Sequence, residues 1–212
     1  MASASSSASA SGSLTNDKWV LRARPSGVFS SAECCGAMEH EEVDVSSLAP
    51  DEIVVRVETL SVDAFLRTML DADAYHGSVT LGATMPAMGI GVVVAAGRDA
   101  KLGVGKKVLG MLGAQTVARL TPGPMGPMAL MKLPGVPESA SLGLLGLTTG
   151  LTAWVGMFRV APRSPRAGET VLVTAAAGAV GSIAAQLALT TGARVIGVAG
   201  GASKCGGGGS DD

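Results

Sequence analysis

Hydrophobic and polar positions alternate in short stretches over the first half of the chain. Four stretches are rich in β-branched side chains and are bounded by polar or glycine positions, which is typical of β-strands. We predict these strands over residues 18–24, 52–60, 88–96 and 107–112. Short strands joined by glycine turns indicate a compact β domain, which we expect to be a barrel. Asp63 precedes the amphipathic stretch AFLRTML, so it is predicted to begin a short helix.

The pattern changes after Pro137. Residues 138–160 are compatible with helix, and the polar segment APRSPRAGE (161–169) predicts a joint. The apolar stretch VLVT (171–174) is typical of a strand that is buried on both faces of a parallel sheet. A second apolar stretch, VIGVA (195–199), predicts another strand of the same kind.

A helical stripe lies between these two strands. Val180, Ile183, Ala184 and Leu187 are spaced i, i+3, i+4 and i+7, which places them on one face of a helix. Gly192 is the predicted end of that helix. Strand, helix and strand together predict one βαβ unit.

These patterns divide the chain into two domains, with a boundary near residues 120–135. The predicted organisation is a disordered tail over 1–16, a β domain over 17–130, an α/β domain over 131–205 and a flexible tail over 206–212. The fold class is therefore α/β plus β.

Composition narrows the function classes. The 212 residues carry 16 Lys and Arg against 17 Asp and Glu, and only 3% are aromatic, so neither nucleic acid nor an anionic membrane is an expected partner. Three cysteines without a secretory signal favour a reducing compartment. We expect a cytoplasmic protein, with a Ser/Ala-rich plastid leader as the alternative.

The segment TAAAGAVGSIAAQ (174–186) contains the most specific functional motif in the chain. A dinucleotide-binding turn needs one glycine for the tight turn, one for close approach of the pyrophosphate and one for helix packing. Ala176, Gly178 and Gly181 stand at these three places. Amide groups at the start of the following helix can then face phosphate oxygens. An α/β packing turn that binds nothing is the alternative.

The second strand indicates which dinucleotide is bound. NAD sites usually place an acidic residue near the end of this strand, yet residues 170–210 contain neither Asp nor Glu. Ser203 and Lys204 follow the strand instead and suit a 2′-phosphate, so NADPH is favoured over NADH. A solvated lysine is the alternative for Lys204.

The sequence does not predict a metal site. Two His and three Cys show neither CxxC nor HxxxH spacing. Cys34, Cys35 and His40 are either a small cluster or, as we favour, partly buried thiols beside a solvated histidine.

Several motifs, taken in order, resemble a known family. They are WVLRARPSG (19–27), LSVDAFLRTML (60–70), MPAMGIGVVVAAG (85–97), GLTAWVGM (150–157), VLVTAAAGAVGS (171–182) and VIGVAGGASKC (195–205). This set resembles the zinc-independent medium-chain dehydrogenase/reductases, in the branch of prostaglandin reductases and alkenal double-bond reductases. An alanine at the position of Ala176 is ordinary in that branch. Ala64 departs from it, since proline is usual there.

The resemblance implies a GroES-like barrel domain followed by the start of a Rossmann domain. It implies NADPH-dependent reduction of the C=C bond of small α,β-unsaturated ketones or aldehydes, in which hydrogen-bond donors stabilise the developing enolate. The residues it implies for the pyrophosphate are Gly178, Ala179, Val180 and Gly181. It further implies Lys204, with Ser203, for the 2′-phosphate and Thr152 for the nicotinamide side.

For the substrate cleft the resemblance implies Asp63 and Arg67, whose alternative roles are a helix cap and a structural ion pair. It implies no catalytic residue in this chain, because the tyrosine expected to assist the enolate has no counterpart and Tyr75 comes too early. The family's homodimer is not expected of a chain this short.

Family members also continue beyond the position of Cys205, so we expect a C-terminally truncated chain with partly exposed strands, weak NADPH binding and association through sheet edges. Three hypotheses follow: an enone reductase, a non-catalytic truncated fragment or interaction module, and a zinc-free quinone oxidoreductase.

Overall fold

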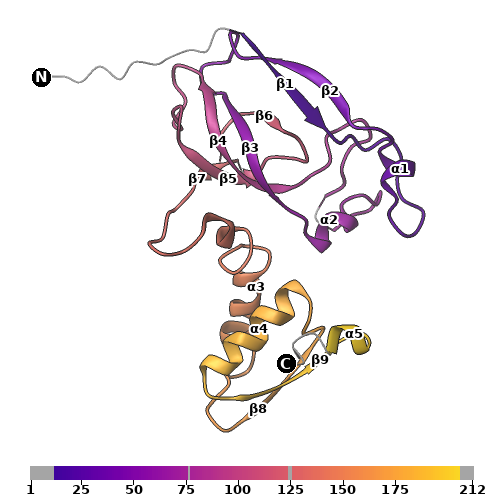
Figure 1. Cartoon of the computed structure of the whole chain (residues 1–212), viewed down its shortest axis with the longest axis vertical. Coiled ribbons are helices and arrows are strands. Elements are labelled where there is room, and N and C mark those ends of the chain that lie inside the picture. The colour runs from indigo at the N-terminus through magenta and orange to yellow at the C-terminus, as the bar shows by residue number, and fades with distance from the viewer. Residues whose placement is uncertain (1–11, 76, 124–125, 206–212) are drawn as a thin grey trace, which may run out of the picture. The chain divides into compact units, whose positions relative to one another are not determined.

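The computed structural model describes residues 12–75, 77–123 and 126–205, and the chain divides into two compact units (Figure 1). Unit 1 comprises Met1–Pro134 and unit 2 comprises Gly135–Asp212. The division falls slightly beyond the expected domain end at residue 130. The predicted tail 206–212 and residues 1–11 of the other predicted tail lie outside the described residues.

The described residues of unit 1 form two antiparallel sheets and two short helices. Strands β1 (Ser13–Lys18) and β2 (Glu39–Asp44) form a two-stranded sheet. The larger sheet has the order β6-β3-β4-β5-β7. Its strands are β3 (Ile53–Ser61), β4 (Met88–Ala96), β5 (Lys107–Met111), β6 (Val117–Leu120) and β7 (Met128–Ala129). The helices are α1 (Ser31–Cys34) and α2 (Ala64–Thr68).

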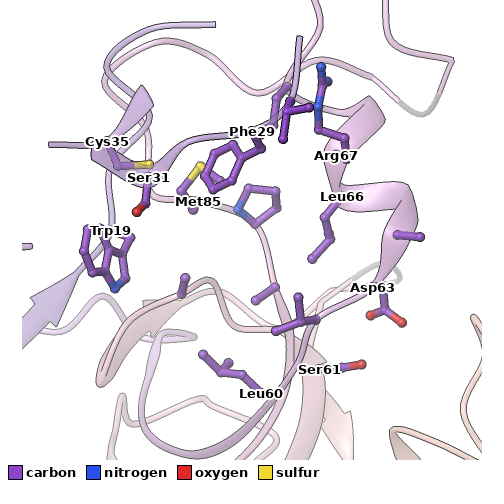
Figure 2. A pocket seen from close by; sticks show the side chains of 17 residues that line it. Trp19, Phe29, Ser31, Cys35, Leu60, Ser61, Asp63, Leu66, Arg67 and Met85 are labelled. Carbon is purple, nitrogen blue, oxygen red and sulfur yellow. The ribbon is translucent and has the colours of Figure 1, made fainter. Parts of the chain in front are cut away.

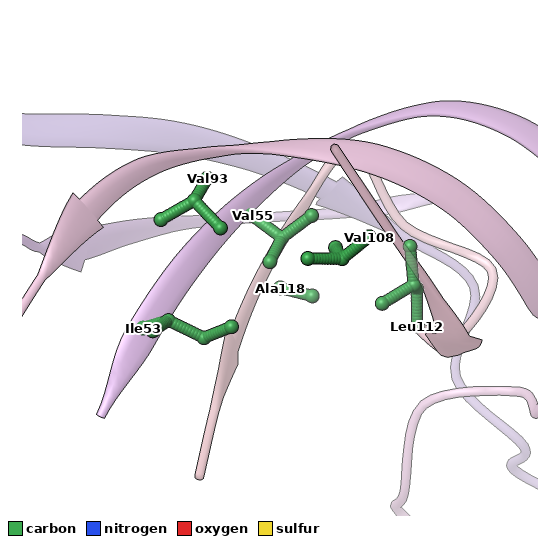
Figure 3. Close-up of a cluster of buried hydrophobic side chains, with 6 residues drawn as sticks. All are labelled: Ile53, Val55, Val93, Val108, Leu112 and Ala118. Atoms are coloured by element: carbon green, nitrogen blue, oxygen red, sulfur yellow. The ribbon is translucent and has the colours of Figure 1, made fainter. Parts of the chain in front are cut away.

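Two hydrophobic clusters of unit 1 lie on opposite faces of β3. Ile53 and Val55 point to one face, where they pack with side chains from the neighbouring strands (Figure 3). The other members of this cluster are Val93, Val108, Leu112 and Ala118. Val54 points to the opposite face and packs with Val43 and Val45, which lie in and just after β2. Because side chains pack against both faces of the first part of β3, Ile53, Val54 and Val55 are fully buried.

Strand β1 corrects the expectation of a disordered tail over residues 1–16. Asn16, in the middle of β1, is buried and donates from Nδ2 to Glu41 Oε1 and to Gln115 Oε1, both at 2.9 Å. Its Oδ1 accepts from the backbone N–H of Val117 at 2.9 Å. The strand SLTNDK has no apolar alternation, so these hydrogen bonds, together with the packing of Leu14 against the Val54 cluster, hold it in place.

The predicted strand over residues 18–24 is wrong for most of its length. Strand β1 ends at Lys18, and Val20 forms only an isolated bridge with Thr84. Trp19 donates its N–H to the carbonyl of Ala114 at 3.0 Å, whereas Leu21 donates to Ala83 at 3.0 Å. The segment is therefore extended but changes partners at every second residue, which prevents a regular ladder.

Unit 2 contains one βαβ arrangement preceded by short helical segments. Strands β8 (Thr170–Thr174) and β9 (Arg194–Val198) are parallel and in register, with helix α4 (Ala179–Thr190) between them in sequence. Gly192 has φ +79°, as the predicted helix end requires. Helix α5 (Ala202–Cys205) follows β9. This part of the prediction is confirmed.

The helix-compatible stretch 138–160 forms separate segments. They are the 3₁₀ helix η1 (Glu138–Ser141), the α-helix α3 (Gly150–Val155) and the π-helix η2 (Gly156–Val160). A Cβ at Gly150 would overlap the carbonyl oxygen of Leu144, so the chain folds back tightly between η1 and α3. That close approach excludes a continuous helix.

The apolar strands of unit 2 are only partly covered. Val173 is buried, whereas Leu172, Ile196 and Val198 are 62%, 43% and 49% exposed. The expectation that these strands remain partly exposed is therefore confirmed. Within the described residues, no helix is both long enough and apolar enough to span a membrane.

Candidate functional site

The turn between β8 and α4 is held by its own backbone. Ala175 follows β8 with φ +51°, a left-handed conformation that is unusual for a residue other than glycine. Gly178 donates its N–H to the carbonyl of Ala175 at 2.8 Å. Ala176 donates its N–H to the carbonyl of Val198 at 3.0 Å, which ties the turn to β9. The turn therefore has a defined position over the carboxyl ends of both strands.

The two glycines of the turn serve different purposes. A Cβ at Gly181 would overlap the carbonyl oxygen of Ala175, so glycine is needed there for the first turn of α4 to pack against the chain. A Cβ at Gly178 would lie 3.1 Å from that same oxygen, and the φ of −85° at Gly178 suits any residue. Gly181 therefore serves packing, whereas Gly178 keeps an exposed backbone surface free of a side chain.

The start of α4 can hold an anion. Gly178 is the N-cap residue, and no side chain caps the helix. The first amide groups of a helix have no acceptor within the helix, and the helix dipole favours negative charge beside them. Gly178 and Ala179 are exposed, while Val180 and Gly181 are partly exposed. This arrangement fits a phosphate or pyrophosphate group.

Thr152 lies with the turn residues around one cavity of unit 2. Its hydroxyl donates to the carbonyl of Leu147, which precedes α3, at 3.3 Å. The cavity measures about 850 Å³ and is lined by Thr152, Val180 and Gly181 among others. Ser203 and Lys204 lie on α5, directly after β9, and both are exposed. The structure thus joins Thr152 to the turn and leaves the side chains on α5 accessible to a ligand.

Unit 1 contains a separate cavity of about 790 Å³ (Figure 2). Its walls are mostly apolar and come from segments distant in sequence. The labelled apolar side chains in Figure 2 are Trp19, Phe29, Leu60, Leu66 and Met85. A cavity of this size and lining suits a small, largely apolar molecule.

Asp63 and Arg67, which were predicted for a substrate cleft, both line this cavity. Arg67 donates from Nη1 to Asp71 Oδ1 and from Nη2 to the carbonyl of Gly27, both at 2.9 Å. Asp63 is the N-cap residue of α2, but its side chain does not cap the helix. Arg67 therefore has the structural ion pair that was its alternative role, with Asp71 as the partner.

Cys35 forms part of the same wall. Burial, with a smaller contribution from Cys34, raises the pKa of the Cys35 thiol above its ordinary value. The thiol is therefore protonated at neutral pH and behaves as a small apolar group. His40 contacts Asp17 at 2.7 Å, and no cluster of three potential metal ligands occurs in the described part of the chain.

Sequence reasoning missed two kinds of site residue. The cavity residues Trp19, Phe29 and Met85 carry no local signal, since only the tertiary fold brings them together. Gly197 in β9 was also missed, although it lies against the methyl group of Ala176. Its signal was present, because glycine within an apolar strand often marks a close backbone approach.

Comparison with known proteins identifies the family. Residues 17–126 match the family described as the N-terminal domain of oxidoreductase. The chain is 35% identical to NADPH-dependent curcumin reductase from Escherichia coli, over 90% of this chain and 52% of that protein. It is 34% identical to 2-alkenal reductase (NADP(+)-dependent) from Nicotiana tabacum, over 79% of this chain and 48% of that protein.

A solved structure agrees with these sequence matches. The structure of CurA in complex with NADPH from Vibrio vulnificus superposes with a TM-score of 0.73 at 31% identity, over 90% of this chain and 53% of that one. The chain belongs to the zinc-independent medium-chain dehydrogenase/reductases. The expected GroES-like domain and start of a Rossmann domain are confirmed. The chain spans about half the length of the curated relatives it matches.

Proposed function

We propose that this chain binds NADPH and contributes to reduction of the C=C bond of α,β-unsaturated ketones and aldehydes. The relatives named above, a curcumin reductase and a 2-alkenal reductase, support this reaction class. The observation that carries the proposal is the turn before α4, where Gly178 leaves the uncapped helix start open to a phosphate. NADPH, when bound, supplies a hydride to the β-carbon of the substrate.

The residues of unit 2 have distinct roles in this proposal. The amides of Ala179, Val180 and Gly181 bind the pyrophosphate, because they lie in the first turn of α4. Lys204 binds the 2′-phosphate through its ammonium group, assisted by the hydroxyl of Ser203. Thr152 lies on the nicotinamide side, in keeping with its place on the cavity that Val180 and Gly181 also line.

The cavity of unit 1 holds the apolar body of the substrate. Its apolar wall removes water from the neighbourhood of the bound molecule, which strengthens electrostatic interactions there. Asp63 and Arg67 are the charged groups on this wall, and the bonds from Arg67 to Asp71 and Gly27 fix the orientation of its guanidinium. We assign no residue of this chain to proton transfer.

Cofactor binding tests the proposal directly. Titration with NADPH, followed by calorimetry, should show binding weaker than micromolar, and NADH should bind more weakly still. Gly178→Ala should reduce NADPH affinity by about tenfold, since the new methyl group occupies the surface that the pyrophosphate approaches. Gly143→Ala is the matched control, because a Cβ there is 3.9 Å from its nearest neighbour. Equal affinity of both variants for NADPH would contradict the placement of the pyrophosphate.

Lys204→Ala tests the choice between the two cofactors. It should lower affinity for NADPH and leave affinity for NADH unchanged, because only NADPH carries the 2′-phosphate. Lys204→Arg should retain the preference, since it keeps the charge. If the loss is the same with both cofactors, Lys204 does not contact the 2′-phosphate.

Turnover separates the three functional hypotheses. NADPH oxidation with an enone, but not with a quinone, supports the proposed reaction. The reverse preference supports a quinone oxidoreductase. A folded chain that oxidises NADPH with neither substrate supports a non-catalytic role.

A further inference from the structure

Gly197 and Ala176 fit together as a pair. Gly197 is in β9, and Ala176 stands in the turn where the dinucleotide fingerprint usually has its first glycine. A Cβ built on Gly197 would lie 2.9 Å from the Cβ of Ala176, and apart from its chain neighbours no other heavy atom of the described residues lies within 4 Å of it. The space beside the turn is therefore filled by one methyl group, which comes from the turn rather than from the strand.

This contact cannot be relieved by rotation of a side chain. The Cβ of alanine is attached directly to the backbone, so moving it means moving the turn itself. The turn is also tied to β9 by the hydrogen bond from the N–H of Ala176 to the carbonyl of Val198, at 3.0 Å. A second methyl group at position 197 would push the turn away from the strand and strain that bond.

We propose that Gly197 is a positioning residue for the dinucleotide-binding turn, and that it provides the space which the first glycine of the fingerprint usually provides. The inference rests on the proposed function, since it concerns where the pyrophosphate-binding amides of α4 lie. Gly197 itself acts through Ala176 and touches no ligand. Ala175 and Gly178, on either side of the contact, move with Ala176 because one short turn contains all three.

The backbone at Gly197 does not itself require glycine. It is not among the residues with positive φ, and alanine is slightly more favourable than glycine within a strand. Any loss caused by Gly197→Ala must therefore come from the contact with Ala176. The contact can therefore be tested by moving the methyl group from position 176 to position 197.

Four proteins test the inference: the wild type, Ala176→Gly, Gly197→Ala and the double variant. The double variant has the same composition as the wild type, with the methyl group moved from the turn to the strand. Gly197→Ala should weaken NADPH binding by about tenfold, and the double variant should recover most of the loss. Ala176→Gly alone should change affinity little. If the double variant binds NADPH as weakly as Gly197→Ala, the inference is wrong.

A second ligand distinguishes positioning from general destabilisation. Adenosine 2′-phosphate carries the phosphate expected to contact Lys204 but lacks the pyrophosphate. Gly197→Ala should leave its affinity unchanged, because the displaced part of the site is the turn. Equal loss of affinity for both ligands would overturn the positioning role.

The inference remains testable if the wild type fails to bind NADPH, which would refute the proposed function alone. In that case the thermal unfolding of unit 2 is compared across the same four proteins. A midpoint that falls in Gly197→Ala and recovers in the double variant supports the coupling of the two positions. A midpoint that falls equally in both variants refutes it.

Discussion

The two units contain sheets of similar composition with very different burial. In unit 1, Ile53 on β3 is fully buried, because neighbouring strands and the small sheet cover both faces of β3. In unit 2, Ile196 on β9 is 43% exposed, and Leu172 on β8 is 62% exposed. The difference shows that an apolar sequence indicates only that a strand can be buried. How far its side chains are actually buried depends on how many elements pack around it.

This contrast also concerns function. The turn that we propose to bind the cofactor follows β8, and its position depends on the hydrogen bond between Ala176 and Val198 of β9. The cavity of unit 1 lies instead beside a buried hydrophobic cluster that includes Cys35 and Leu70. The cavity should therefore retain its shape under conditions that already loosen the turn.

The largest expected loss of stability follows from truncation of the buried isoleucine. Ile53→Ala should lower the free energy of unfolding of unit 1 by about 2–5 kcal/mol, since it leaves a void in a packed cluster. Ile196→Ala, the same change on β9, should cost less than about 1 kcal/mol in unit 2.

Tryptophan fluorescence during urea unfolding measures the two effects separately. The chain has two tryptophans, Trp19 in unit 1 and Trp154 in unit 2. Ile53→Ala is therefore followed in a Trp154→Phe background, and Ile196→Ala in a Trp19→Phe background. Similar losses in the two units would contradict the difference in burial.

A smaller loss of stability is expected from substitution of Gly181, the glycine that lets the first turn of α4 pack closely. Gly181→Ala forces a methyl group onto the carbonyl oxygen of Ala175 and should destabilise unit 2 by roughly 1–3 kcal/mol. Gly178→Ala should cost much less, because its Cβ meets that oxygen at 3.1 Å. Differential scanning calorimetry of both variants checks the order, and a larger loss in Gly178→Ala would reverse the roles assigned to the glycines.

The same contrast explains what the sequence could predict. Strands β8 and β9 and helix α4 are predicted nearly to the residue, since their signals are local: apolar strands, a helical stripe and Gly192 at the helix end. The position of the turn between β8 and α4 is predictable for the same reason, because its residues are contiguous.

The missed elements depend on distant contacts. Strand β1 is polar, and its Asn16 is held by Gln115 and Val117, about half the chain away. Residues 138–160, which were predicted only as compatible with helix, form separate helical segments because of a close local approach of Gly150 to Leu144. The cavity of unit 1 joins Trp19 to Ala114, so no local pattern predicts it, and only the family resemblance indicated Asp63 and Arg67 on its wall.

The third prediction concerns Ala175, whose backbone has a left-handed conformation. Here the substitution should increase stability rather than lower it. Ala175→Gly should stabilise unit 2 by about 0.5 kcal/mol, because glycine adopts φ +51° without the steric cost that alanine bears. Ala177→Gly, two residues along and without positive φ, should instead destabilise it by about 0.5–1 kcal/mol. Thermal unfolding of the two variants measures the signs, and a loss of stability in Ala175→Gly would show that the turn is not strained.

The smallest expected effect is a pH dependence of the unfolding midpoint of unit 1. Hydrogen bonds from the hydroxyls of Ser46 and Ser47 and from the backbone of Ser46 lower the pKa of Asp44 to about 2. A carboxylate with a lowered pKa contributes stability above its ordinary pKa of about 4 and loses that contribution as the pH falls through the lowered value.

Asp44→Asn should therefore lower the unfolding midpoint of unit 1 slightly at neutral pH. The gap to the wild type should close between about pH 4 and pH 2, where the native carboxylate becomes protonated. Glu169→Gln provides the counterpart in unit 2, because the hydrogen bond from Arg163 lowers the pKa of Glu169. Each substitution should affect only its own unit, so a shift of the unit 2 midpoint in Asp44→Asn would show that the units do not unfold independently.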